Sequence, residues 1–273
     1  PQKATVTISG KSIQKNSNND IWEFVEELAS SLNARPPKNI IVGLEPNFFI
    51  TSADVVTEAD TRRYYDETLF LSLPMMRLFS KDELAAVIGH ELGHFKGDDL
   101  AYSQKFYPIY AGSGQALKTL SEKAGDDEGL QALALLPAIA VLSFFIEKFN
   151  EAEAEIGRGR EFEADKAGMQ VSSPNSLATA LMKVSVLAPI WSTILEKMAE
   201  YINEDKSLQN ASVTFNEVAL ATVKDKDSID FSSFENHQIT HPTDTHPPTA
   251  SRIKEMGFDS EVIQEEALKI PED

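Results

Sequence analysis

The hydrophobic positions of the chain follow a strand-like pattern in its first third and a helical pattern afterwards. In the first third, short apolar runs are typical of strands, and one longer segment with apolar residues every three or four positions is typical of a helix. We therefore expect a small sheet and one helix in this part, with 57–66 as a loop. The expected strands cover 4–8, 39–43, 47–51 and 67–73, and the expected helix covers 20–32.

After about residue 80 the apolar positions recur every three or four residues, as they do in helices. Pro189 should interrupt one long helical stretch, and the polar segment 225–246 should be a surface loop. The fold class that we predict is α+β, a mainly helical domain with a small N-terminal β-sheet. The expected helices begin at Ser80 and then cover 147–171, 173–188, 190–202, 214–223 and 247–256.

Residues 130–146 form a run of seventeen positions without charge. That length is at the lower limit for crossing a bilayer, and Gln131, Pro137 and Ser143 interrupt the run. We expect a buried helix here. The alternative is a segment that lies on a membrane or dips into it.

The segment 80–95 carries the strongest local signals in the chain. Ser80 followed by Glu83 is a capping box, in which the hydroxyl accepts a hydrogen bond from the Glu83 amide and the carboxylate accepts one from the Ser80 amide. A helix should therefore begin at Ser80. Apolar residues at helical spacing continue it to Leu92, and Gly97 offers a stop signal.

Two histidines, His90 and His94, lie four residues apart in this expected helix. Their side chains stand on one face and can share a metal ion. Glu91 lies about 100° further round, where its carboxylate can reach a water on the ion but not easily the ion itself. In this H-E-x-x-H pattern the imidazoles hold zinc and the glutamate takes a proton from the water. The alternative, two histidines that are solvated or capping, is disfavoured because the match falls in a well-formed helix.

A catalytic zinc needs a third protein ligand, here a later histidine or a carboxylate, and one position open to water. Glu161 and Asp165 are four residues apart on one expected helical face. This spacing lets Glu161 bind zinc while Asp165 accepts the free ring N–H of a liganding histidine. Glu163 lacks such a helper, because the matching position is Ala167. The alternative is that Glu161 and Asp165 are ordinary charges paired with nearby arginines.

Composition excludes several other classes of function. The formal net charge of −18, over 273 residues, argues against nucleic acids and anionic lipid surfaces as the main partner. The absence of cysteine excludes disulfides and thiol chemistry, and it also argues against a purely structural zinc site, which usually fills all four positions with Cys or His. A 42% share of hydrophobic residues indicates a folded protein.

Three motifs together resemble the HtpX-like zinc metallopeptidases, the group that includes the type I CaaX prenyl proteases. They are H-E-L-G-H at 90–94, E-F-E-A-D at 161–165, and T-H-P-P with R-I within 245–253. The resemblance runs from about residue 20 to about residue 256, and the motifs occur in the family's order and rough spacing. It implies a zincin-type metallopeptidase fold in which His90, His94 and Glu161 bind zinc. It also implies that Glu91 is the general base and that Asp165 supports the ligands from outside the first coordination shell.

The same resemblance bears on three further residues. His246 matches a family histidine near the active site, which steadies the oxyanion or, in some relatives, closes over the zinc; from its position alone it could instead cap the helix after it. Asn47 falls where relatives begin an N-A-F or N-A-Y edge-strand motif, but here the motif reads N-F-F. Arg252 is either a structural ion-pair partner or a substrate contact.

We therefore expect a zinc-dependent metalloendopeptidase with one Zn²⁺ per chain that hydrolyses polypeptides, with a role in membrane-protein quality control. The alternative is a latent or non-catalytic, chaperone-like zinc module closed by His246. We expect one metallopeptidase domain over 1–273, as the soluble part of a longer, membrane-anchored chain, on the cytoplasmic side of the membrane. No nucleic-acid partner is expected, and the sequence predicts no particular oligomeric state.

Overall fold

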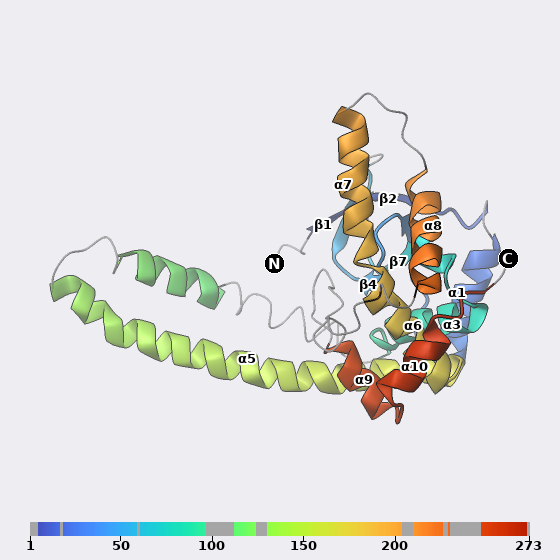
Figure 1. Cartoon of the computed structure of the whole chain (residues 1–273). Coiled ribbons are helices and arrows are strands. Elements are labelled where there is room, and N and C mark those ends of the chain that lie inside the picture. The colour runs from blue at the N-terminus through green and yellow to red at the C-terminus, as the bar shows by residue number, and fades with distance from the viewer. Residues whose placement is uncertain are drawn as a thin grey trace. The chain divides into compact units, whose positions relative to one another are not determined.

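The structure is a computed structural model, and it describes residues 5–16, 19–58, 61–96, 112–123, 130–203, 210–225, 229 and 247–271. Contacts divide the chain into two compact units, the first made of 1–96 with 161–273 and the second of 97–160. The colours of Figure 1 show that the first unit combines N-terminal strands, in blue and cyan, with C-terminal helices, in orange and red. The predicted class, α+β and mainly helical, is confirmed.

The first unit contains two small sheets where the sequence predicted one. A four-stranded sheet has the order β2-β3-β7-β4, and a three-stranded sheet has the order β1-β5-β6. Apolar residues of both sheets share one buried cluster, which includes Ile8, Val55 and Phe70. The strands are β1 (Thr5–Ile8), β2 (Gly10–Ser12), β3 (Asn39–Gly43), β4 (Phe49–Thr51), β5 (Asp54–Thr57), β6 (Arg63–Tyr64) and β7 (Thr68–Ser72).

The four predicted strands are confirmed with small shifts of their ends, but β2, β5 and β6 were not expected. The expected loop 57–66 is wrong in part, because it contains β6 and the last residue of β5. These strands are only two to four residues long, and their pairing partners hold them in place: β5 lies between β1 and β6. A strand this short contains too few alternating apolar and polar residues to be predicted from the sequence.

Strand β4 forms one edge of the four-stranded sheet. It pairs antiparallel with β7, for example Phe49 opposite Phe70, and has no strand partner on its other side among the described residues. Helix α3 (Lys81–Gly93) packs against it. The edge strand therefore lies next to the helix that carries the H-E-x-x-H motif.

The predicted start of α3 is confirmed in detail. The Ser80 amide donates to Glu83 Oε2 at 2.7 Å and the Glu83 amide donates to Ser80 Oγ at 3.1 Å, so both halves of the capping box are present. The helix ends at Gly93, and His94 is its C-cap. The expected stop at Gly97 lies outside the described residues.

Glycines allow α3 to lie very close to the last part of α5 (Leu130–Val171). A Cβ atom on Gly93 would lie 2.9 Å from the Cα of Ala164, and one on Gly168 would lie 2.6 Å from the carbonyl oxygen of Ala86. Real Cβ atoms essentially never come so close to backbone atoms. Only residues without a side chain permit this contact between the two helices.

Helix α6 (Pro174–Leu187) begins where a helix was expected, is capped by Ser173, and packs on α3 and on the C-terminal helices. Lys183 on α6 donates to Glu83 Oε2 at 2.7 Å and to the Leu78 carbonyl at 2.9 Å, and the Lys183 and Glu83 side chains are both buried. Burial lowers the pKa of Lys183, against the opposing effect of Glu83. This buried ion pair joins α6 to the start of α3.

The remaining helices largely match the expectations. The predicted break at Pro189 is confirmed between α6 and α7, whereas the short helix α2 and helix α10 were not expected. Most of the loop 225–246 lies outside the described residues. Residue Gly257 ends α9 with a positive φ of 86°, which favours glycine. These helices are α1 (Asn19–Ser31), α2 (Leu73–Met76), α7 (Ile190–Asn203), α8 (Ala211–Lys224), α9 (Thr249–Glu255) and α10 (Ser260–Ala267).

One stretch of the described residues, Pro174–Tyr201, has the length and apolar composition of a membrane-spanning helix. However, 67% of the most apolar 18-residue part of this stretch is buried inside the protein. Core helices of soluble proteins can have the same length and apolar composition. This stretch covers α6 and most of α7, so its apolar character is explained by packing.

The second unit contains a helix over 112–123 and the first part of α5, up to residue 160. The expectation of a buried helix at 130–146 is wrong for the side chains that are described. Leu136, Val141, Phe144 and Phe145 are each more than half exposed, although the segment is helical. An apolar composition favours burial, but a helix is buried only where another element packs on it.

We predict that Gly168→Ala destabilises the protein, because the new methyl group collides with the backbone of α3. The cost of overpacking, about 1–3 kcal/mol, should exceed the gain in helix propensity, and the midpoint of thermal unfolding should fall by several degrees. The matched control is Gly157→Ala in the same helix, where nothing lies within 4 Å of the added atom. The control should be neutral or slightly stabilising. Equal midpoints for the two variants would contradict this account of the helix contact.

Candidate metal centre

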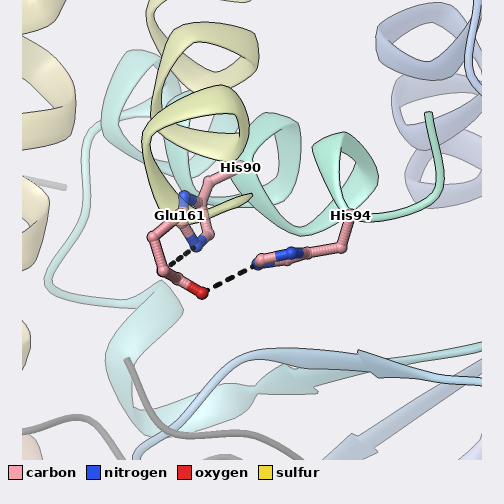
Figure 2. Close-up of side chains that lie close together, drawn as sticks. All are labelled: His90, His94 and Glu161. Carbon is pink, nitrogen blue, oxygen red and sulfur yellow. Dashed lines mark ion pairs between the residues drawn. The ribbon is translucent and has the colours of Figure 1, made fainter. Parts of the chain in front are cut away.

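Two helices bring the three predicted metal ligands together. His90 and His94 come from the end of α3, and Glu161 comes from α5. Figure 2 shows the Glu161 carboxylate facing both imidazole rings. Its Oε2 lies 3.6 Å from His90 Nε2 and its Oε1 lies 3.5 Å from His94 Nε2. One ligand atom from each residue lies within 4.8 Å of the others, which is close enough for a shared metal ion.

The spacing and chemistry of these atoms fit a divalent metal. At 3.5 and 3.6 Å the carboxylate oxygens are too far from the rings for good hydrogen bonds. Ligands of a tetrahedral zinc at bond lengths of about 2.0–2.1 Å stand roughly 3.3 Å apart. Two imidazole nitrogens and a carboxylate oxygen are also a donor set that zinc accepts in hydrolytic enzymes. The cluster is therefore able to hold a metal, with His90 and Glu161 buried and His94 half-buried.

Asp165 lies one helical turn beyond Glu161 and contacts the outer nitrogen of His90. Its Oδ1 is 2.9 Å from His90 Nδ1, while Nε2 of the same ring faces Glu161. A carboxylate that accepts the Nδ1 proton fixes the ring so that Nε2 carries the lone pair. The structure thus places Asp165 where the spacing argument expected it.

Arg252 on α9 completes this arrangement from the far end of the chain. Its Nε donates to Asp165 Oδ2 at 3.0 Å, and its Nη2 donates to Asp165 Oδ1. Nη2 also lies 3.1 Å from His90 Nδ1, and the side chain is almost completely buried. Of the two alternatives left open by the sequence, the structure shows the ion pair. Its signal in the sequence is an arginine on the same helical face as the buried Thr249 and Ile253.

Burial and this ion pair shift the pKa values of the groups around the cluster. Burial, followed by the Arg252 charge, lowers the pKa of His90 to about 4, so that the ring is neutral and able to bind a metal. Burial by itself would raise the pKa of Asp165, but Arg252 and His90 hold this pKa well below its usual value. Asp165 is therefore ionised at neutral pH and accepts hydrogen bonds from both partners.

Glu91 lies beside the ligands without belonging to the cluster. The backbone amide of Ile50 in β4 donates a hydrogen bond to its carboxylate. Its Oε2 atom is buried and has no hydrogen-bond partner among the described residues. Burial raises the pKa of Glu91 to about 7. A buried carboxylate oxygen of this kind is costly unless a polar group or water binds it, which marks the place as a site for a ligand.

Two other residues named from the sequence have different outcomes. His246 lies outside the described residues, so its predicted role stays a prediction. Asn47 lines a pocket together with His90 and Glu91, and its side-chain oxygen accepts a hydrogen bond from the Phe48 amide at 2.9 Å.

Comparison with known proteins decides the family. A model of peptidase family M48 matches residues 15–257, which is most of the chain. The chain belongs to peptidase family M48. It is therefore a metalloprotease, and the HtpX-like resemblance predicted from its motifs is confirmed.

The relatives of this M48 member include several proteins named protease HtpX homolog. One from Lactobacillus helveticus is 25% identical over 260 residues, covering 89% of this chain and 74% of the relative. One from Gemmatimonas aurantiaca is 29% identical over 243 residues, covering 86% of this chain and 73% of the relative. One from Thermococcus kodakarensis is 29% identical over 183 residues, covering 60% of this chain and 56% of the relative. No solved structure matches the chain significantly.

We predict that Glu161→Gln loses most of its bound zinc, because the neutral amide is a much weaker ligand than the carboxylate. Asp165→Asn should bind zinc about 10–100-fold more weakly, because His90 loses the partner that orients it. Metal content after dialysis against a zinc buffer, measured by mass spectrometry, checks both. Glu163→Gln is the matched control, since Glu163 lies in the same helix but is exposed and paired with Lys166. Zinc retained in Glu161→Gln at the control's level would show that Glu161 is not a ligand.

Proposed function

We propose that this M48 protein is a zinc endopeptidase in which His90, His94 and Glu161 hold the ion and Glu91 is the general base. The observation that carries the proposal is the position of Glu91. Its buried Oε2 atom has no partner among the described residues and lies next to a His-His-Glu cluster with the spacing of metal ligands. A purely structural metal site does not require a buried carboxylate oxygen without a hydrogen-bond partner beside it.

The side chains divide the work of peptide hydrolysis. When bound, zinc supplies a Lewis acid that acidifies the attacking water and polarises the scissile carbonyl. Glu91 takes the proton of that water and delivers it to the leaving amine. General acid–base catalysis of this kind typically raises the rate by about 10²–10⁴-fold. The Ile50 amide holds the Glu91 carboxylate in place, and Arg252 and Asp165 hold His90.

We further infer that the substrate lies extended along β4. This strand is an edge of its sheet, contacts α3, and contains the amide that binds Glu91. An extended peptide can add to such an edge through main-chain hydrogen bonds, which align it regardless of its sequence. Asn47, just before β4, lines the neighbouring pocket together with His90 and Glu91.

Membrane association, on the cytoplasmic side and with membrane proteins as substrates, is the biological setting that we propose. Its support in the structure is the second unit, where Leu136, Val141, Phe144 and Phe145 are exposed along α5. Because the chain has a net charge of −18, we expect the contact with lipid to be apolar, without attraction to anionic headgroups. The latent, chaperone-like alternative depends on His246, outside the described residues, and stays a prediction.

We predict that Glu91→Gln abolishes cleavage of casein or a fluorogenic peptide, by at least about 10²-fold, while zinc content stays near one ion per chain. The reason is that glutamine resembles glutamate in shape but cannot accept the proton. A chelator should abolish the activity of the parent protein, and added zinc should restore it. Glu163→Gln again serves as the control with parental activity. Parental hydrolysis by Glu91→Gln would refute the assignment of the base.

We also predict that the protein floats with vesicles of neutral phosphatidylcholine, and that Phe144→Asp with Phe145→Asp reduces the bound fraction. Both rings are more than half exposed, and placing a charge at either position makes contact with the acyl region unfavourable. Flotation in a density gradient measures the bound fraction. Exchanging two exposed polar residues of α5, Glu151→Gln and Glu163→Gln, controls for general effects on the helix. If the aspartate double variant floats as well as this control, the apolar segment does not contact lipid.

A further inference from the structure

Helix α9 carries Arg252, and it is a short helix without a capping side chain at its start. It covers seven residues, Thr249–Glu255, and its N-cap is Pro248, which makes no side-chain capping hydrogen bond. Helices this short have little stability of their own in water and depend on tertiary contacts. The position of the Arg252 side chain therefore depends on what holds α9 against the rest of the first unit.

Two kinds of contact hold α9 against α6. Ile253 packs with Ala178 and Met182 of α6 in one buried apolar cluster. The Ser185 hydroxyl of α6 donates a hydrogen bond to the Thr249 hydroxyl at 2.9 Å, and both side chains are buried. The apolar contact is non-directional, whereas a hydrogen bond has a preferred distance and angle. The Ser185–Thr249 bond is therefore the contact with α6 that can fix the rotation of α9 about its axis.

The Ser185 hydroxyl binds another helix, although it lies inside a helix of its own. Serine and threonine hydroxyls at such positions commonly face solvent or donate to a carbonyl of the preceding turn. Thr179 on α6 does the latter, because its buried hydroxyl lies 3.0 Å from the Asn175 carbonyl and 3.1 Å from the Ser176 carbonyl. A buried hydroxyl without a partner is costly. Ser185 and Thr249 thus depend on each other, whereas Thr179 depends only on α6.

Thr249 lies one helical turn before Arg252. Residues three positions apart are neighbours on a helix surface, so the hydroxyl bond acts close to the arginine. The guanidinium binds both oxygens of Asp165, and its Nη2 lies 3.1 Å from His90 Nδ1. Such a two-bond contact between arginine and a carboxylate requires a specific geometry. A rotated or displaced α9 would therefore weaken the contacts that orient the His90 ring.

We propose that Ser185 and Thr249 are positioning residues, whose hydrogen bond holds α9 in the rotation that lets Arg252 fix Asp165 and the His90 ring. The inference rests on the zinc site of the proposed function and adds two residues to it. Because the two hydroxyls bind each other and not a metal ligand, their effect on zinc passes through Arg252 and Asp165.

Zinc affinity tests the proposal by a measurement that needs no turnover. Ser185→Ala and Thr249→Val each remove one hydroxyl, and valine keeps the branched shape of threonine. In competition with a chromophoric chelator, each variant should bind zinc about 10-fold more weakly than the parent protein, as is typical when a group that supports a metal ligand is lost. The double variant should bind as weakly as the single variants, because all of them lack the same bond. Parental zinc affinity in both single variants, shown to be folded by circular dichroism, would refute the proposal.

Two controls separate positioning from stability. Thr179→Val removes a buried hydroxyl that bonds only to α6, so it should lower the midpoint of thermal unfolding and leave zinc affinity unchanged. Thr249→Ser removes a buried methyl group but keeps the hydroxyl, so it should also lower this midpoint and keep zinc affinity. If zinc affinity instead fell in proportion to lost stability across all four variants, the hydroxyls would have no positioning role.

Removal of Arg252 tests the route by which the hydroxyls act. Arg252→Gln should weaken zinc binding by itself, because Asp165 and His90 lose their partner. Adding Ser185→Ala to this variant should cause no further loss, since the side chain that it positions is gone. A further loss as large as that in the parent background would overturn the proposal. Should the parent protein show the expected zinc affinities but cleave no peptide, the positioning role would be supported and the peptidase function refuted.

Discussion

The close contact between α3 and the end of α5 is the constraint on which the rest of the site depends. Gly93 and Gly168 leave no room for a Cβ atom, so the two backbones approach to a distance that ordinary side chains forbid. At that distance the Glu161 carboxylate lies 3.5 Å from the His94 ring and 3.6 Å from the His90 ring. Larger residues at the glycine positions would separate the helices, and the three ligand atoms could no longer share one ion.

A second set of contacts fixes the ligands once the helices have met. Arg252 binds Asp165 through two nitrogens, and Asp165 binds the outer nitrogen of His90. These groups are buried, so each charge depends on its partners for the interactions that water would otherwise provide. The ion pair therefore couples α9, near the end of the chain, to the orientation of a ring on α3. The burial that makes these contacts strong also keeps His90 neutral.

Helix α6 packs on α3 and lines the pocket beside His90 and Glu91. Lys183 joins it to the capped start of α3, and Leu177, Leu181 and Val184 line the same pocket as Glu91. Strand β4 contributes the Ile50 amide and is the last strand of its sheet among the described residues. Helix α6 and strand β4 thus both lie next to Glu91, the proposed general base.

The sequence by itself determined the features that depend on neighbours within one or two helical turns. Ser80 and Glu83 predicted the start of α3. The four-residue spacings predicted one shared face for the histidines and the positions of Glu161 and Asp165 beside them, because helical geometry repeats regardless of the rest of the fold. Only the tertiary structure decided that Arg252 is the partner of Asp165 and that Leu136, Val141, Phe144 and Phe145 are exposed. The first depends on two residues 87 positions apart meeting in space, and the second on which element packs against a helix, and neither is encoded in local spacing.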